Sequence, residues 1–371
     1  RGIPADEFTA VVRCDPKRAG LLYAGTDRTV YASFDDGDTW QPLSLNLPTT
    51  WYRDLLVHDD DLIAATQGRG IWVLDDVTPL RELAAGAAEE AVHLVTPSPA
   101  VRLRASESHD TPWPPETPLG ENPPAGAMLD YWLDRPAGGG VTLTVRNRAG
   151  DTVRRFSSED RPESLVTHPY FETAWLGTAR TLSVTAGMHR FVWDLRETRP
   201  AAPEYGYSIA AVRTQGTPVE PEGPLVPPGA YTVTLAANGT TITRPLTVRL
   251  DPRVRVTQRD LQQQYDETRA AISVLERGVA TLREIGRVQS THARSLPAAM
   301  VDSIAFLTGP ADASLRTTTH RVSGLVGDLE SADGAPTGAQ RLFLDDCRLL
   351  MDGLVARWRM LATTIPAADR R

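Results

Sequence analysis

The side chains that most often perform catalysis are spread widely along this chain. No two of the seven histidines are four residues apart, the spacing that lets one helix face bind zinc; they occupy positions 58, 93, 109, 168, 189, 292 and 320. The sequence contains no Gly-x-Ser-x-Gly elbow, phosphate-binding loop or dinucleotide fingerprint. We therefore predict no nucleophile, no metal site and no cofactor.

Carboxylates are abundant and suggest glycoside hydrolysis as the chemistry to test. That reaction needs two acids facing each other across a sugar, or, in sialidase-like enzymes, an arginine cluster with a tyrosine and an acid. Each conspicuous carboxylate has a structural explanation in a turn or cap; these are Asp35, Asp36, Asp75, Asp76 and Asp194. We interpret His58-Asp59-Asp60-Asp61, between two apolar stretches, as a solvated hairpin turn rather than a cation site.

One octet, Ser33-Phe34-Asp35-Asp36-Gly37-Asp38-Thr39-Trp40, has a mechanical explanation. Asp36-Gly37 is a hairpin turn signal, because Gly accepts a positive φ and Asp bonds its own backbone. The hydroxyl and carboxylate two residues apart can accept turn amide protons, and the tryptophan can pack back across the hairpin. We predict a folding clip whose structural residues are Ser33, Asp35, Gly37 and Trp40.

The framework around the octet repeats 40 positions later. Five residues match identically: Leu22, Ala24, Thr26, Asp35 and Asp36 are answered by Leu62, Ala64, Thr66, Asp75 and Asp76. Repeats of about 40 to 45 residues built from short apolar strands are typical of propeller blades, which must stack on neighbours to bury their faces. The repeat predicts two such blades.

The octet fits Ser/Thr-x-Asp-x-Gly-x-Thr-Trp at every fixed position. In this it resembles the Asp-box, or BNR-repeat, propellers of sialidase-like glycosidases, xyloglucanase-like proteins and sortilin-type receptors. It is most similar to large exported bacterial proteins of the BNR-repeat glycosyl hydrolase or sortilin-like type, whose final blade reads much like residues 65–76 and leaves through Thr78-Pro79-Leu80. The resemblance implies that residues 1–80 are the last two blades, and that the box serves architecture, not activity.

Arg28 and Arg69 are our candidates for ligand contact. They fall in the loops that follow Thr26 and Thr66, and in a propeller such loops can face the axis. Surface salt bridges are the alternative for both arginines. The resemblance also implies that further blades lie upstream of Arg1, in the same precursor or in a second chain, and hold any catalytic groups.

After the repeat, the composition predicts three more segments. Residues 81–125 are rich in Pro and Ala, which predicts an extended connector with short strands at 92–95 and 100–103. Residues 126–252 carry about seven short strands and resemble the Ig-like module of flagellar hook-capping proteins and bacterial export tails. The expected strands are 128–133, 141–146, 153–156, 180–184, 189–194, 231–236 and 241–248.

The period becomes helical in residues 253–371. A first helix after Thr257, imitating a capping box with Asp260, carries an apolar stripe of Leu261, Tyr265, Thr268, Ile272, Leu275, Val279, Leu282 and Ile285. A second carries Leu315, Val322, Leu325 and Leu329. A third carries Phe343, Cys347, Leu350, Leu354 and Leu361, with Trp358 beside the stripe. We predict an antiparallel bundle of three helices, or four if residues 297–306 form another.

Composition excludes several classes of function. A net charge of −8 with scattered basic residues argues against nucleic-acid binding, and no apolar run approaches the roughly 18 residues of a membrane span. We interpret Cys14 and Cys347 as two buried thiols rather than a long-range disulfide.

The sequence therefore predicts a mainly β protein with an α-helical C-terminus: final β-propeller blades, an Ig-like β-sandwich and an antiparallel helical bundle. We expect a non-catalytic binding or assembly module of an exported protein, periplasmic or extracellular, that recognises a protein or glycan. The alternative is the C-terminal part of a glycoside hydrolase whose catalytic residues lie in upstream blades.

Overall fold

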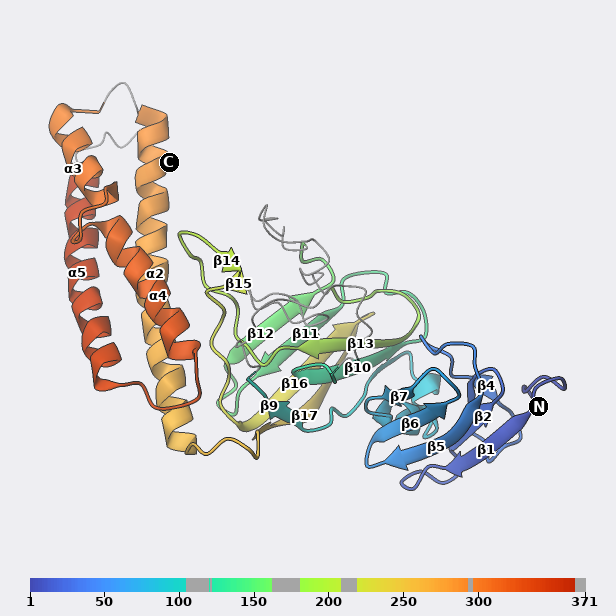
Figure 1. Ribbon diagram of the computed structural model, residues 1–371. Coiled ribbons are helices and arrows are strands. Elements are labelled where there is room, and N and C mark those ends of the chain that lie inside the picture. The colour runs from blue at the N-terminus through green and yellow to red at the C-terminus, as the bar shows by residue number, and fades with distance from the viewer. Residues whose placement is uncertain (105–119, 121, 162–180, 208–218, 293–295, 364–371) are drawn as a thin grey trace.

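Figure 1 shows three bodies in a row in the computed structural model: small sheets at the N-terminal end, a larger β body in the middle and a group of helices at the other end. The structure describes residues 1–104, 120, 122–161, 181–207, 219–292 and 296–363. Each body has its own hydrophobic core. The chain is thus rich in β-structure and helical at its C-terminus, as its hydrophobic periodicity predicts.

The first body contains two antiparallel sheets in which strands follow chain order. The four-stranded sheet contains β1 (Thr9–Cys14), β2 (Leu22–Thr26), β3 (Val30–Ser33) and β4 (Gln41–Pro42); the three-stranded sheet contains β5 (Tyr52–His58), β6 (Asp61–Thr66) and β7 (Ile71–Leu74). They share one core, to which Tyr23 and Val30 contribute from one sheet and Leu55 and Leu62 from the other. The sequence analysis did not predict β4.

The repeated threonines, Thr26 and Thr66, make similar local contacts in the two sheets. Thr26 and Thr66 each end the second strand of their sheet, and each hydroxyl accepts or donates within the turn that follows: Thr26 Oγ1 donates to the carbonyl of Thr29 at 3.0 Å, and Thr66 Oγ1 to that of Gly70 at 2.6 Å. The two turns differ in length, because the acceptor is three positions along the chain from Thr26 and four positions from Thr66.

A short helix, α1 (Thr78–Leu83), and a 3-10 turn, η1 (Ala87–Glu89), follow the second sheet. The extended connector was expected to begin at residue 81, and α1, which continues to Leu83, includes its first residues. The helix forms because Pro79 stands in the first turn, where its missing N–H costs nothing, and because Asp76 Oδ1 accepts the amide of Thr78 at 2.9 Å. Residues 105–119 and 121 of the expected connector lie outside the described residues.

The middle body is built from two sheets around one core. The smaller sheet has the order β13–β10–β8, with β8 (Val92–Leu94), β10 (Ala127–Leu133) and β13 (Gly187–Trp193). The larger has the order β12–β11–β16–β17–β9, with β9 (Ala100–Arg102), β11 (Thr142–Arg146), β12 (Thr152–Ser157), β16 (Gly229–Ala237) and β17 (Thr240–Leu250). The two expected connector strands are thus incorporated into these sheets, one into each.

One expected strand is absent from the described part of this body. Residues 181–184 were expected to belong to a strand spanning 180–184, but they have no strand pairing, and residue 180 lies outside the described range. Leu182 is nevertheless buried in the core, and the carbonyl of Ser183 accepts the hydroxyl of Tyr131 at 2.8 Å. The apolar residues there are buried in a loop. An apolar sequence pattern indicates burial, but it does not distinguish a buried loop from a paired β-strand.

Four helices form the third body: α2 (Gln258–His292), α3 (Ala298–Thr308), α4 (Leu315–Glu330) and α5 (Gly338–Ala362). The expected cap of α2 is confirmed, since the amide of Asp260 donates to Thr257 Oγ1 at 3.1 Å. Thr337 and Gln340 form a reciprocal capping box at the start of α5. Helix α4 packs against α2 and α5. Helix α3 is the additional helix that was expected as an alternative at residues 297–306.

The apolar stripe expected on α5 is confirmed at Cys347 and Leu354 and is wrong at Phe343. Phe343 is exposed, and the residues that enter the core are Leu344, Cys347, Met351, Leu354, Val355 and Trp358. The helix carries apolar residues on two faces, so periodicity alone does not decide which face packs inward. The two cysteines are free; Cys347 is buried, but Cys14, at the end of β1, is exposed, contrary to expectation.

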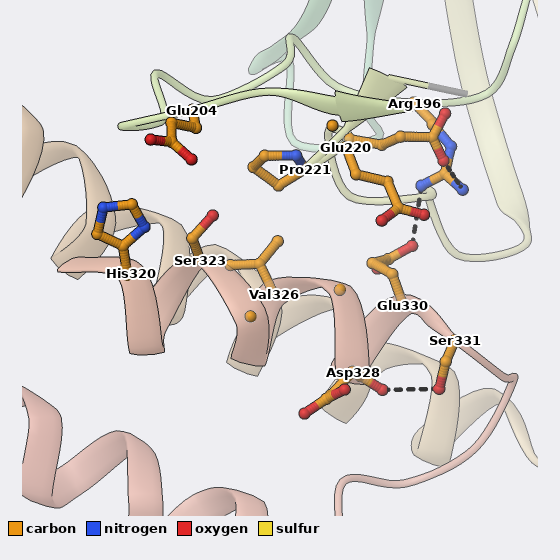
Figure 2. Close-up of a pocket in the computed structure, with 14 residues that line it drawn as sticks. Arg196, Glu204, Glu220, Pro221, His320, Ser323, Val326, Asp328, Glu330 and Ser331 are labelled. Atoms are coloured by element: carbon orange, nitrogen blue, oxygen red, sulfur yellow. Dashed lines mark hydrogen bonds and ion pairs between the residues drawn. The ribbon is translucent and has the colours of Figure 1, made fainter. Parts of the chain in front are cut away.

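The middle and helical bodies meet through buried ion pairs. Arg102 Nη1 lies 2.5 Å from Asp333 Oδ1, and Arg196 Nη1 lies 3.0 Å from Glu330 Oε2 at the end of α4 (Figure 2). The hairpin of β14 (Gly206–Tyr207) and β15 (Val219–Glu220) extends from the middle body toward the same helix.

Candidate functional site

The hairpin of residues 33–40 is held by its own side chains. Asp35 Oδ1 accepts the amide of Thr39 and the hydroxyl of Ser33, both at 2.8 Å, and Oδ2 accepts the hydroxyl of Thr39 at 2.5 Å. Ser33 Oγ accepts the amide of Gly37 at 2.9 Å, and Trp40 Nε1 donates to the carbonyl of Gly37 at 2.9 Å. The hydrogen bonds from Thr39, with that from Ser33, lower the pKa of Asp35. Its carboxylate is therefore occupied within the hairpin.

The loops that carry Arg28 and Arg69 lie at one end of the two sheets, which we call the loop end. Thr50 connects them, because its amide donates to the carbonyl of Arg28 at 3.4 Å and its hydroxyl to the carbonyl of Gln67 at 3.0 Å. Arg28 is paired with Asp6, at 2.8 Å between Nη2 and Oδ2. Arg69 is exposed, and its carbonyl accepts Trp72 Nε1 at 3.0 Å.

The loop end also has an aromatic and cationic cluster whose residues were not predicted as site residues from the sequence. Phe8 and Trp51 form an edge-to-face pair with ring centroids 6.0 Å apart, and the Arg53 guanidinium carbon lies 3.6 Å from the Trp51 ring centroid. Arg53 Nε also donates to Gln67 Oε1 at 2.9 Å. The available signal was positional: Phe8 and Trp51 each immediately precede the first strand of a sheet. The exposed Phe8 ring and the exposed Arg53 guanidinium, which stacks on the half-buried Trp51 ring, offer an apolar and cationic contact for a ligand.

One face of the β5–β7 sheet is apolar and exposed; we call it the outer face. Leu56 pairs with Ile63 and Ile63 with Val73, so the three side chains form a row across the sheet, and Ile71 stands beside it. Leu56, Val73 and Ile71 are 54%, 51% and 72% exposed. The opposite face, with Leu55, Leu62 and Ala64, is buried against the first sheet. Since side chains alternate between the two faces of a strand, the pairing register decides both which residues are buried and which are exposed.

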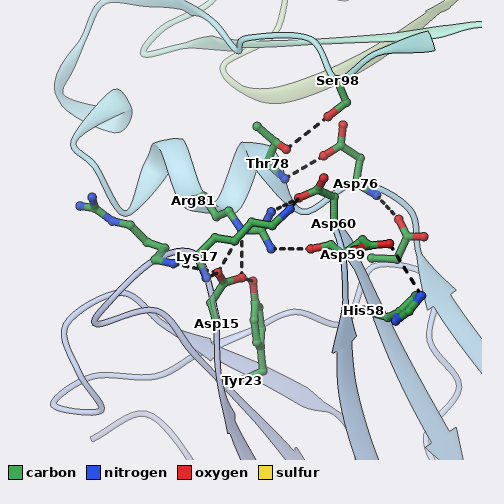
Figure 3. A network of polar contacts seen from close by, with 12 residues as sticks. Asp15, Lys17, Tyr23, His58, Asp59, Asp60, Asp76, Thr78, Arg81 and Ser98 are labelled. Atoms are coloured by element: carbon green, nitrogen blue, oxygen red, sulfur yellow. Dashed lines mark hydrogen bonds and ion pairs between the residues drawn. The ribbon is translucent and has the colours of Figure 1, made fainter. Parts of the chain in front are cut away.

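A buried polar network closes the other end of the two sheets (Figure 3). Arg81 of α1 donates from Nε to both oxygens of Asp15 at 3.0 Å, and its Nη1 donates to Asp60, which also binds Lys17 at 2.7 Å. Tyr23 donates its hydroxyl to Asp15 at 3.2 Å. Burial opposes ionisation of Asp60, but hydrogen bonds from Lys17 and Arg81 outweigh it and lower its pKa.

This network corrects one expectation about the turn at residues 58–61. The turn does join two strands, but Asp60 is held by Lys17 and Arg81 and Asp61 accepts the amide of Asp76 at 2.9 Å, so the turn is not simply solvated. Across the residues that the structure describes, no group of three or more His, Cys, Asp or Glu side chains is arranged to hold a metal ion. Within the same residues, no helix is long and apolar enough to cross a membrane.

Comparison with known proteins gives little. No family model matches the chain, and no curated protein matches it. Two solved structures are weakly similar, both of the extracellular domain of BT4673 from B. thetaiotaomicron, described as a putative one component system and as a putative hybrid two component system; identity is 8% in both and the TM-scores are 0.16 and 0.17. The match covers 68% of this chain and 26% of those chains, so this chain spans about a quarter of their length.

Proposed function

We propose that this chain is a non-catalytic binding and assembly module of an exported BNR-repeat protein. In this proposal the two N-terminal sheets are β-propeller blades, the middle body is an Ig-like sandwich and the four helices are an antiparallel bundle. The outer face of the β5–β7 sheet docks a further blade, supplied by the same precursor or by a second chain. The loop end, with Trp51 and Arg53, contacts a protein or glycan ligand.

The observation that carries the proposal is the exposed outer face. Four large aliphatic side chains in register on one sheet face make a continuous apolar surface, and such surfaces mark contact sites in soluble proteins. The two sheets already pack by burying the opposite face, with strands in chain order, which is how blades stack. A third sheet of the same kind would bury the outer face in the same way.

We propose a non-catalytic role because the prominent carboxylates are held in structural contacts. Asp35 is bound within its hairpin, and Asp15 and Asp60 hold α1 through Arg81. Arg28, a candidate for ligand contact, is balanced by Asp6 and remains able to reach a ligand only by exchanging that partner. Recognition therefore rests on the exposed rings and guanidinium groups of the loop end rather than on an acid and a base.

Site-specific photo-crosslinking tests the docking partner. Benzoylphenylalanine at Ile71, in the protein isolated from its native source, is expected to crosslink to a β-hairpin peptide carrying an Asp-box, identified by mass spectrometry. The same group at Leu342, a 69% exposed residue of α5, is the matched control and should capture no such peptide. Crosslinks from position 71 only to unrelated sequences, or none at all, would show that the outer face does not dock a blade.

A second experiment separates binding from hydrolysis. The full-length precursor is assayed on a panel of chromogenic glycosides and on a glycan array. Binding without turnover supports the proposal. Turnover that is abolished by single carboxylate substitutions in upstream blades would establish the alternative, a glycoside hydrolase of which this chain is the C-terminal portion.

A further inference from the structure

Two neighbouring cavities lie where the middle body meets the helices. One cavity of about 440 Å³ is enclosed by the β14–β15 hairpin above and by α4 below (Figure 2). A second, of about 400 Å³, continues along α2 and α4. Glu204 and His320 line both cavities, so the two lie next to each other along α4, and we call them together the groove.

The groove is long compared with a small metabolite. Its lining on α4 extends from Arg316 to Glu330, and a helix rises 1.5 Å per residue, so this stretch covers roughly 21 Å. A polypeptide in extended conformation advances about 3.3 Å per residue. The groove therefore matches the length of about six extended residues.

The two ends of the groove carry opposite charges. In the larger cavity, Glu204, Glu220, Glu222, Asp328 and Glu330 share the lining with a single arginine, Arg196. Arg196 lies 2.7 Å from Glu222 and 3.0 Å from Glu330, and Glu330 Oε2 also lies 3.4 Å from Arg104 Nη2, so the charges of these two acids are partly compensated. The smaller cavity is lined by Arg283 and Arg316 together with Glu204, and neither guanidinium has an ion-pair partner among the residues that the structure describes.

The floor of the groove contains two glycines that the protein's own packing does not explain. Gly324 and Gly327 lie inside α4, where glycine weakens a helix relative to alanine. A Cβ at either position would meet no described atom within 4 Å. By contrast, Gly278 of α2 is required by packing, since a Cβ there would lie 2.4 Å from Thr319 Oγ1. Bare helix backbone beneath an open groove leaves room for a ligand main chain.

We propose that this groove binds an extended peptide that carries a cationic side chain at one end and a carboxylate about five residues away, at the two ends of a six-residue stretch. The cation lies beside Glu222 and Glu330, and the carboxylate lies between Arg283 and Arg316. A polyamine matches only the acidic end and an anion only the basic end, whereas a peptide with opposite charges at its two ends satisfies both. Its main chain passes over Gly324 and Gly327.

Calorimetric titration with synthetic hexapeptides tests the charge requirement. The probes are acetylated and amidated Lys-Ala-Ala-Ala-Ala-Glu and Glu-Ala-Ala-Ala-Ala-Lys, which cover both chain directions, and Gln-Ala-Ala-Ala-Ala-Gln as the uncharged control. At low salt, one of the charged peptides is expected to bind at least about tenfold more tightly than the control. Equal affinity for all three, or tighter binding of spermidine than of either charged peptide, would overturn the proposal.

Substitutions in two helices separate binding from folding. Gly324→Leu fills the groove and should raise the melting temperature while weakening the preferred peptide at least about tenfold. Gly353→Leu is the matched control: it changes an exposed glycine of α5 with equally open surroundings, and should raise the melting temperature with no effect on binding. Arg283→Gln with Arg316→Gln, at two exposed positions, should weaken binding similarly. Unchanged affinity in Gly324→Leu and in the arginine pair would overturn the proposal.

Discussion

Arg190 of β13 and Asp130 of β10 face each other across adjacent strands and form an ion pair of 2.9 Å. The same guanidinium donates to the carbonyls of Asp75 and Asp76, at 2.6 and 2.9 Å. One arginine therefore connects the second N-terminal sheet to the middle body. Burial raises the pKa of Asp130, although Arg190 acts in the opposite direction.

Removal of Arg190 is expected to destabilise this junction strongly. Arg190→Met leaves the Asp130 side chain, only 4% exposed, charged and unpaired, which should cost about 3–5 kcal/mol in the first unfolding transition in urea. Adding Asp130→Leu removes that charge and should recover part of the loss. Arg249→Met, at an exposed position of β17, should change little. An Arg190→Met protein as stable as wild type would contradict the role of this pair.

Asp35 should make the stability of the hairpin at residues 33–40 depend on pH. Its pKa is below the ordinary value of 3.8, so it contributes stability above that value and loses the contribution as the pH falls through its folded pKa. Asp35→Asn is expected to lower the melting temperature at pH 7 and to approach wild type at pH 2. Asp38→Asn, which removes the same charge from the same hairpin, is the control. A deficit of equal size at both pH values would show that the charge of Asp35 is not what stabilises the clip.

Two glycines of α2 are expected to respond in opposite directions to the same change. A Cβ at Gly278 would lie 2.4 Å from Thr319 Oγ1 and 2.8 Å from Met351 Cε, so Gly278→Ala should destabilise the helical body by about 1–3 kcal/mol. Gly286 has no described atom within 4 Å of that position, and Gly286→Ala should stabilise by about 1 kcal/mol. Denaturation followed by helical circular dichroism measures both. Stabilisation by both substitutions would mean that α2 and α4 do not approach closely at Gly278.

The two thiols should react at very different rates. Cys14 is exposed, whereas Cys347 is buried in the helical core and burial raises its pKa. A thiol reagent such as dithionitrobenzoate should label one cysteine per chain quickly in native protein and the second only after denaturation. Cys14→Ser should abolish the fast phase. Rapid labelling of both thiols in native protein would show that α5 is not packed as described.

The elements that could be predicted are those controlled by nearby residues. Asp36-Gly37 specified a tight hairpin because positive φ is inexpensive there, and φ at Asp36 is 57°. The cap of α2 by Thr257 and Asp260 likewise depends on groups three residues apart. Prediction failed where the apolar pattern was compatible with two structures. Leu182 is buried in a loop rather than in a strand, and α5 buries Leu344 instead of Phe343.

The candidate sites were less accessible to sequence reasoning than the fold. Arg28 and Arg69 were chosen from their place in the repeat, and Thr50 does connect their two loops. Nothing in the local sequence indicated that Arg53 stacks on Trp51 beside them, or that Asp6 neutralises Arg28. Those contacts depend on which strands become neighbours.

By itself, the sequence determined the local hairpins, the helix caps and the 40-residue repeat, because each depends on hydrogen bonds and turn geometry within a few positions. Only the tertiary structure decided which charges meet. Asp15 and Arg81 are 66 positions apart and Arg196 and Glu330 are 134 apart, yet both pairs are in contact. Burial makes an unpaired charge costly, so the packing of the three bodies against one another decides which charges become partners. The groove over α4 exists only because the middle body packs against the helices.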